Sequence, residues 1–131
     1  MDAHRQRVAE ACLAASYEGA RNFPAILGEL AGAGFEGYLV DYRRGRTTYF
    51  LPDGDSVDVE NQETPGTVEA VFMAEVVEAN VRKSQAGTHS YVEFCKAVKA
   101  AGCAGYIVSL LGRRVTYFGR TGETHVELMP S

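Results

Sequence analysis

Two stretches of this sequence are near copies of each other, and this repeat limits the possible folds more than any other feature. Residues 23–54 align without a gap with residues 91–122, and ten of the 32 positions are identical. The identical pairs, each separated by 68 residues, are Ala33/Ala101, Gly34/Gly102, Gly37/Gly105, Tyr38/Tyr106, Val40/Val108, Arg46/Arg114, Thr48/Thr116, Tyr49/Tyr117, Phe50/Phe118 and Gly54/Gly122. Because chance rarely produces an ungapped match of this length, we predict an internal duplication.

Each copy is predicted to begin with two helices. Apolar residues recur at three- and four-residue steps over residues 2–18 and, after a Thr-Pro start, over residues 65–82, which indicates two longer helices. A shorter helix is expected after Asn22 and another after Ser90, since both residue types are common N-caps. Glu93 has the spacing from Ser90 that completes a capping box.

Three strands are predicted to follow the helices in each copy. The runs EGYLVDY and AGYIVSL are rich in β-prone residues, and RTTYFL and RVTYFG are their partners across tight turns of arginine and glycine. The turns PDGD and RTGE then lead to SVDVE and HVELM. One half would be marginally stable by itself, so we expect the two to share a core.

The predicted fold class is therefore α+β, built as a tandem duplication of an α-α-β-β-β unit. The repeats are expected at about 2–63 and 64–131, within one domain that has a pseudo-twofold axis. We expect the helices to pack on one face of a mainly antiparallel sheet.

Alternation along the strands assigns their side chains to two faces of the sheet. With a first hairpin that turns at Arg44-Gly45, one face is mostly apolar, and we expect it to meet the helices. This apolar face holds Tyr38, Val40, Tyr42, Thr47, Tyr49 and Leu51, together with Tyr106, Val108, Leu110, Val115 and Tyr117. The opposite face, called the mixed face below, holds Leu39, Asp41, Arg43, Arg46, Thr48 and Phe50, together with Ile107, Ser109, Leu111, Arg114, Thr116 and Phe118.

The mixed face repeats a pair of large hydrophobic residues that we expect to be cross-strand neighbours. These pairs are Leu39 with Phe50 and Ile107 with Phe118. An exposed apolar patch on a small protein usually marks a binding or oligomer surface, which predicts a homodimer or a protein partner at these four residues. Two alternatives stay open, because loops or a terminus could cover this face, or a ligand cleft could lie between the halves.

Arginines gather near both predicted hairpin tips. If the twofold axis brings the tips to comparable positions, they could bind an anionic group or an acidic partner by charge-assisted hydrogen bonds. The candidate ligand or anion site then consists of Tyr38, Asp41, Arg43, Arg46, Tyr106, Arg113 and Arg114. The alternative, which we favour, is that these arginines keep exposed hairpins soluble and prevent edge-to-edge pairing.

The sequence contains no catalytic, cofactor or metal motif. Its three cysteines lack CxxC spacing, and the other copy has Leu27 and Phe35 where Cys95 and Cys103 stand, so we predict buried, reduced thiols. We therefore expect a binding protein rather than an enzyme, without cofactor or metal. The alternative is a small-molecule binder or a modest enzyme whose pocket lies where the repeats meet. That pocket would be lined by Tyr38, Tyr106, Asp41, Cys95 and the hairpin arginines.

Charge and hydropathy narrow the range of partners. The net charge is −4 and the pI is about 5.4, which argues against a broad attraction to nucleic acid or to anionic membranes. No apolar run reaches the roughly 18 residues that a membrane span needs. The N-terminus also lacks the basic and apolar segments of a signal peptide, so we expect a cytoplasmic protein.

The strings GFEGYLVDYRRGRTTYFLPDG and SYVEFCKAVKAAGCAGYIVSLLGRRVTYFGRTGE resemble a family of unknown function found in bacteria and associated with phages. Some members of that family are labelled as phage envelope proteins. The resemblance runs from about Phe23 onward and is most specific at YVEFCKAVKAAG followed by TYF. It implies a small α+β protein and no established activity, and it assigns no catalytic residues.

Overall fold

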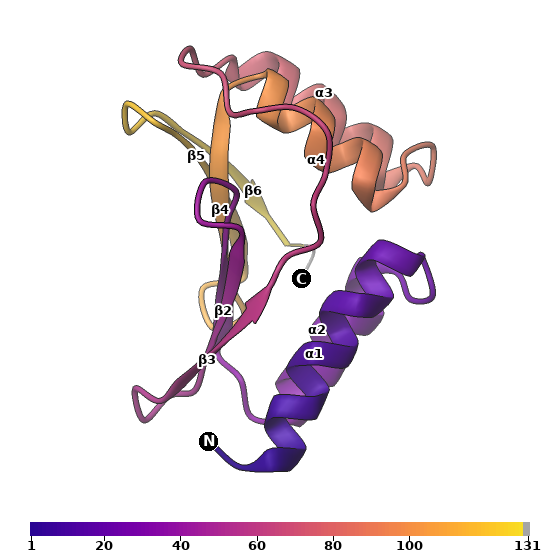
Figure 1. Ribbon diagram of the computed structural model, residues 1–131, viewed down its shortest axis with the longest axis vertical. Helices are drawn as coiled ribbons and strands as arrows, with labels where there is room; N and C mark the ends of the chain where they lie inside the picture. The colour runs from indigo at the N-terminus through magenta and orange to yellow at the C-terminus, as the bar shows by residue number, and fades with distance from the viewer. Residues whose placement is uncertain (130–131) are drawn as a thin grey trace.

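The chain passes twice through the order helix, helix, strand, strand, strand (Figure 1). The structure is a computed structural model and describes residues 1–129. The first half consists of α1 (Ala3–Glu18), α2 (Phe23–Gly32), β1 (Gly37–Asp41), β2 (Arg46–Phe50) and β3 (Ser56–Glu60). The second half consists of α3 (Ala74–Gln85), α4 (Tyr91–Ala100), β4 (Cys103–Ser109), β5 (Arg114–Gly119) and β6 (Thr124–Leu128).

The six strands of the described residues form one antiparallel sheet in the order β3-β2-β1-β4-β5-β6. β1 and β4 meet at the centre, where Leu39 lies opposite Ile107. The strand order and the pairing read nearly the same from either edge, apart from a bulge near Cys103. The predicted α+β class and the antiparallel sheet are confirmed.

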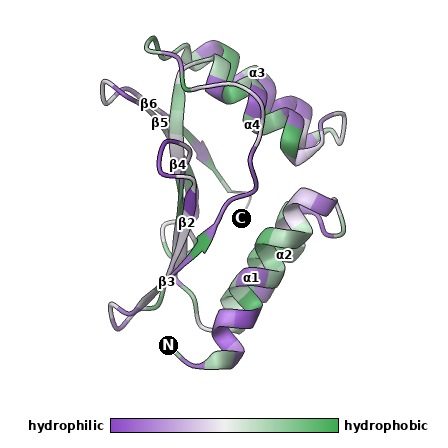
Figure 2. Ribbon diagram, in the orientation of Figure 1, coloured by the Kyte–Doolittle hydropathy of each residue, from purple (hydrophilic) through white to green (hydrophobic). Residues whose placement is uncertain are grey.

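Three of the helices, α1, α2 and α4, begin at residues whose side chains cap them. The carboxylate of Asp2 accepts a hydrogen bond from the Arg5 N–H at 2.8 Å, which starts α1. Asn22 caps α2, and Ser90 forms the expected capping box at α4. Each cap satisfies N–H groups that the first helical turn leaves free. Hydrophobic and hydrophilic residues are mixed along α1 and α3 (Figure 2), and α3 buries Val77 and Val81 at a four-residue step.

The helices lie on one side of the sheet, α1 with α2 beside one half and α3 with α4 beside the other (Figure 1). The apolar face of the sheet is buried against them, with Val40 and Tyr49 at its middle. One cluster of buried residues takes in side chains from both halves, including Leu30 of α2 and Val98 of α4. The expectation that the apolar face meets the helices is confirmed by this burial.

The expected helix over residues 65–82 is wrong in its position. Residues 61–73 form an irregular linker, and α3 begins only at Ala74. The linker backbone bonds to the end of α4 instead of to itself, since Glu69 N–H donates to the Lys99 carbonyl and Met73 N–H to the Ala101 carbonyl. As a result α3 buries Val77 and Val81, while Val71 of the linker stays exposed.

The expected two-residue hairpin turn is also wrong, because both hairpins close with four residues. The Asp41 carboxylate accepts hydrogen bonds from the Arg43 and Arg44 N–H groups at 3.0 Å, and Gly45 ends the turn with φ of 69°. In the second hairpin Arg113 takes the same left-handed conformation with φ of 51°. The register shifts by two residues, an even number, so every paired strand residue keeps its predicted face, whereas Tyr42, Arg43, Leu110 and Leu111 lie in the turns.

Candidate functional site

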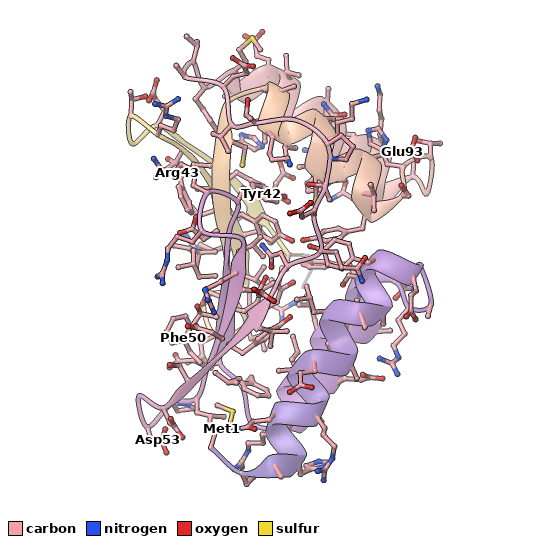
Figure 3. All side chains as sticks on the ribbon, viewed as in Figure 1. Met1, Tyr42, Arg43, Phe50, Asp53 and Glu93 are labelled. Carbon is pink, nitrogen blue, oxygen red and sulfur yellow. The ribbon has the colours of Figure 1, made fainter. Side chains whose placement is uncertain are left out.

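The mixed face of the sheet is the candidate functional site. Within residues 1–129 the helices lie on the opposite side, and Phe50 and Arg43 point away from them whereas Tyr42 points toward them (Figure 3). Ile107 at the centre of this face is 47% exposed, and Leu128 at its β6 edge is 70% exposed. The described residues therefore leave the face open to solvent.

A row of six side chains crosses the middle of the mixed face. From β3 to β6 the row reads Asp58, Thr48, Leu39, Ile107, Thr116 and Val126. The Thr48 hydroxyl donates a 2.6 Å hydrogen bond to the Asp58 carboxylate. The β3 edge of the face is acidic, while the β6 edge is apolar.

The four residues predicted for partner binding all lie on this face, but their pairing differs from the prediction. Leu39 and Ile107 face each other, while Phe50 lies opposite Gly37 and Phe118 opposite Gly105. A Cβ atom at Gly105 would come within 2.8 Å of the Phe118 ring, so this ring covers the glycine. The phenylalanines are thus diagonal neighbours of the central pair, at a distance that aromatic side chains still reach.

A shallow depression lies beside Phe50. It has a volume of about 280 Å³ and is bordered by Gly37, Phe50, Ile107 and Ser109. A side chain at Gly37 would meet the Val108 carbonyl oxygen at 2.3 Å, so only glycine fits there and the surface is hollow. The depression gives the mixed face a shallow recess beside Phe50.

Val126 and Leu128 belong to the mixed face but were not among the predicted binding residues. They lie on the outward side of β6, beyond Thr116 and Arg114 of β5. The alternation of side chains within HVELM predicts that Val126 and Leu128 share one face of the sheet. This prediction is made only when the assignment to two faces is extended from the hairpins to the third strand of each half.

The residues of the predicted anion site do not converge on one point. The two hairpin tips lie at opposite ends of the central strands, because Tyr42 N–H donates to the Ala104 carbonyl and Leu110 N–H to the Glu36 carbonyl. The four steps of a strand between these ends span about 14 Å. Asp41, Arg43 and Arg46 are at the first tip, and Arg113 and Arg114 are at the second.

The two tyrosines of that predicted set, Tyr38 and Tyr106, are buried on the apolar face. Burial raises the pKa of both phenols, so they stay neutral. The Tyr106 hydroxyl hydrogen-bonds the Tyr91 hydroxyl at 2.6 Å. Both tyrosines are therefore on the other side of the sheet from Arg46 and Arg114.

A second group of polar side chains lies on the helix side, where the two halves meet. Tyr91, Cys95 and Lys99 follow one another at four-residue steps along α4 and so share one side of the helix. The Tyr42 hydroxyl donates to the Cys95 sulfur at 3.5 Å. Burial raises the pKa of Cys95 and keeps the thiol protonated, which argues against a nucleophilic role.

Lys99 is the residue of this group that the sequence reasoning missed. Burial lowers its pKa, and its side chain donates hydrogen bonds to the linker. The residue 68 positions before Lys99 is Ala31, so an alignment at this spacing shows Lys99 only as a mismatch. Its spacing from Tyr91 and Cys95 was the usable signal.

Residues 1–129 contain no group of side chains suited to a metal ion and no helix suited to span a membrane. Within that range no three His, Cys, Asp or Glu side chains are grouped so as to hold a metal ion. His89 instead bonds the Asn80 side chain at 2.7 Å. No described helix combines the length and the apolar composition needed to cross a bilayer.

Comparison with known proteins places the chain in a family without an assigned activity. Comparison with curated proteins gives no match. One family model, described as "Protein of unknown function (DUF1398)", matches residues 14–127. That range includes the segments of all the strands except for the last residue of β6, and all the helices except for most of α1. The description carries no phage-envelope label. The chain therefore belongs to the family of proteins of unknown function designated DUF1398.

Proposed function

We propose that this protein is a non-enzymatic binding protein that forms a homodimer through the mixed face of its sheet. One observation carries the proposal, namely that a six-stranded sheet has a face that the described helices leave open and that carries large hydrophobic residues. These residues are Leu39, Phe50, Ile107, Phe118, Val126 and Leu128. Their removal from water on contact with a second sheet would provide the driving force.

The proposal includes a tandem duplication, with repeats at about 2–63 and 64–131. Two facts support it beyond the sequence match. The same order of elements occurs in both halves, and the central pair of the sheet, Leu39 and Ile107, consists of residues at the repeat spacing. A duplicated unit of this kind gives the mixed face an approximate twofold axis, so the apolar side chains are spread over both halves.

The size of the face predicts a dimer of modest affinity. Six strands at about 4.8 Å spacing and five residues at about 3.4 Å rise give a projected area of roughly 490 Å². A stable interface usually buries about 800 Å² of accessible surface on each partner. Side chains that protrude from the sheet make its accessible surface larger than this projected area. The face is therefore at the small end of stable interfaces, and we expect a dimer that dissociates on dilution.

Charge favours one of the two simplest ways to stack the faces. A twofold axis across the strands in the plane of the interface would place Asp58 close to its own copy, which is repulsive. An axis along the strands instead places Leu39 over the partner's Ile107. It also brings Arg46 toward the partner's Phe118 and Arg114 toward the partner's Phe50, where cation–π contacts form. Sheets stack at about 30°, so these pairings are approximate.

The test is a double substitution at the two phenylalanines, Phe50→Asp with Phe118→Asp. Light scattering at increasing protein concentration should show a dimer for the wild-type chain and a monomer for the variant. Circular dichroism should be unchanged, because both side chains are on the outer face. The matched control is Val71→Asp with Val76→Asp, which places two aspartates at exposed apolar positions of the linker and of α3, away from this face, and should leave the mass unchanged.

Two results would contradict the proposal. The first is a wild-type chain that stays monomeric at high concentration, which would leave the face for another kind of partner. The second is an equal loss of mass in the control variant. The three free, buried cysteines fit a reducing compartment such as the cytoplasm, so the measurements belong under reducing conditions.

A further inference from the structure

A partly enclosed cavity lies on the helix side of the sheet, away from the mixed face. It has a volume of about 220 Å³ and is bounded by the first hairpin tip, the linker after β3 and the end of α4. Its walls include the rings of Tyr17 and Tyr42, and Lys99 borders it from α4. Pockets for drug-sized ligands run from about 300 to 1,000 Å³, so this one suits a smaller molecule of roughly ten non-hydrogen atoms.

Lys99 brings a buried positive charge to this cavity. Its side chain is only 6% exposed, and its Nζ donates to the Thr64 carbonyl at 2.9 Å, the Thr64 hydroxyl at 2.7 Å and the Gly66 carbonyl at 3.2 Å. Three acceptors match the three N–H groups of the ammonium form. All three are neutral oxygens.

The charge of Lys99 has no counter-ion among the described residues. None of the ion pairs within residues 1–129 includes Lys99. Buried lysines are almost always paired with a carboxylate, because hydrogen bonds alone replace only part of the lost hydration. An anion in the adjoining cavity would supply the missing charge, and the Gly66 carbonyl, the longest of the three contacts, is the one it would replace.

The tyrosine walls favour a ligand with a flat apolar body. Lys99 Nζ lies 6.0 Å from the centre of the Tyr42 ring, and the Tyr42 hydroxyl is turned to Cys95. Tyr17 packs edge-on against Tyr91, with ring centres 5.1 Å apart. Aromatic rings prefer to pack against rings in offset or edge-on geometry, so an aromatic ligand fits these walls better than a chain-like one.

The polar residues that border this cavity are not repeated in the other half of the chain. At the repeat spacing, the counterparts of Tyr91, Cys95, Lys99 and Tyr42 are Phe23, Leu27, Ala31 and Leu110. All four counterparts are apolar, and two of them, Phe23 and Ala31, are exposed. The fold therefore has no general need for the polar group around Lys99.

Combining these observations, we propose that the cavity binds a small aromatic carboxylate. The carboxylate lies on Lys99 Nζ and the ring lies against Tyr17 and Tyr42. Glu63 also borders the cavity and is exposed, so its carboxylate opposes an anion at the entrance. This opposing charge predicts weak binding in the wild-type chain and tighter binding once it is removed.

The experiment is a calorimetric titration of the full chain with benzoate, with benzamide as a neutral molecule of nearly the same shape. Benzoate should bind saturably at millimolar concentration and benzamide should not. Lys99→Met should weaken benzoate binding at least about tenfold, because a buried charge partner is lost. Glu63→Gln should tighten it about threefold, as expected for removal of one exposed charge.

Lys99 also fastens the linker, so Lys99→Met is first checked by circular dichroism. If that variant does not fold, Glu63→Gln and Tyr17→Leu decide the question, because both positions are at least partly exposed. Any of three results would overturn the proposal. They are a wild-type chain that does not bind benzoate, equal affinity for benzamide and benzoate, and an unchanged benzoate affinity in Glu63→Gln. Light scattering in the presence of benzoate measures dimer formation separately from benzoate binding. Because the dimer uses the opposite face of the sheet, failure of one proposal does not imply failure of the other.

Discussion

Replacing Gly102 by alanine should destabilise the protein far more than replacing Gly34 by alanine. The two glycines stand at the same place in the two halves, two residues beyond α4 and α2, with φ of 86° and 92°. An L-residue in this left-handed region costs about 1–2 kcal/mol. Alanine also restricts the unfolded chain, which offsets about 0.4–1 kcal/mol of that cost. Both variants should therefore share a loss of about 1 kcal/mol.

The surroundings of the two glycines differ. A Cβ atom at Gly34 would find the Arg5 side chain at 3.5 Å, an ordinary contact, whereas one at Gly102 would lie 2.0 Å from the Val71 carbonyl oxygen. The linker has to move by more than about 1 Å to relieve that clash, since buried interiors are close-packed. The movement breaks the 2.8 Å hydrogen bond from Met73 N–H to the Ala101 carbonyl, which contributes about 1 kcal/mol.

The same movement loosens Phe72, which is buried against Gly119. Partial exposure of this side chain costs about 1 kcal/mol more. The free energy of unfolding should thus fall by about 3 kcal/mol in Gly102→Ala and by about 1 kcal/mol in Gly34→Ala. Urea unfolding followed by circular dichroism measures both losses of free energy. The comparison requires that the unfolding free energy changes with urea concentration at the same slope in the two variants. A difference below about 0.5 kcal/mol would refute the proposed packing of the linker on Gly102.

Three further predictions concern buried or capped groups. The three cysteines of the folded chain should not react with Ellman's reagent at pH 8 until urea unfolds the protein, because all three are buried. In addition, burial and a hydrogen bond to Glu29 raise the pKa of Cys12 to about 11. A rapid reaction of the folded protein would contradict this prediction. A backbone hydrogen bond from Ser90 lowers the pKa of Glu93, so the unfolded state binds a proton more readily than the folded state. The urea midpoint of unfolding should therefore fall as the pH drops below about 4.5, and it should fall less steeply in Glu93→Gln. Tyr91→Phe and Tyr106→Phe should each cost about 1–2 kcal/mol, because each removes the hydrogen bond between these two hydroxyls at a part-buried site. The double variant should cost no more than the worse single one, and simple additivity of the two losses would argue against that pair.

Local signals predicted the starts of α2 and α4 and the division of the sheet into two faces. Asn22 and Ser90 satisfy N–H groups within one turn of themselves, so their effect does not depend on the rest of the chain. The faces were predicted correctly although the turns were not, because a shift of two residues keeps every side chain on its side. The four residues predicted for partner binding could thus be assigned to the mixed face before the sheet order was known.

The linker shows where this reasoning fails. Val68, Val71 and Phe72 have helical spacing, yet their segment is irregular. Its backbone hydrogen bonds to the C-terminal end of α4, and Phe72 fills the space that Gly119 leaves open. Such partners are distant in sequence, and intrinsic helix propensity is weak enough for them to override it.

The sequence alone therefore determined most of the elements, their doubled order and the side of each strand residue, because capping and alternation act over a few residues. The tertiary structure decided which strands are neighbours and that the hairpin tips point to opposite ends. It also brought the linker to Lys99 and left a cavity beside it. These features depend on contacts between residues far apart in the chain, and their energies exist only once the two halves have packed around one core.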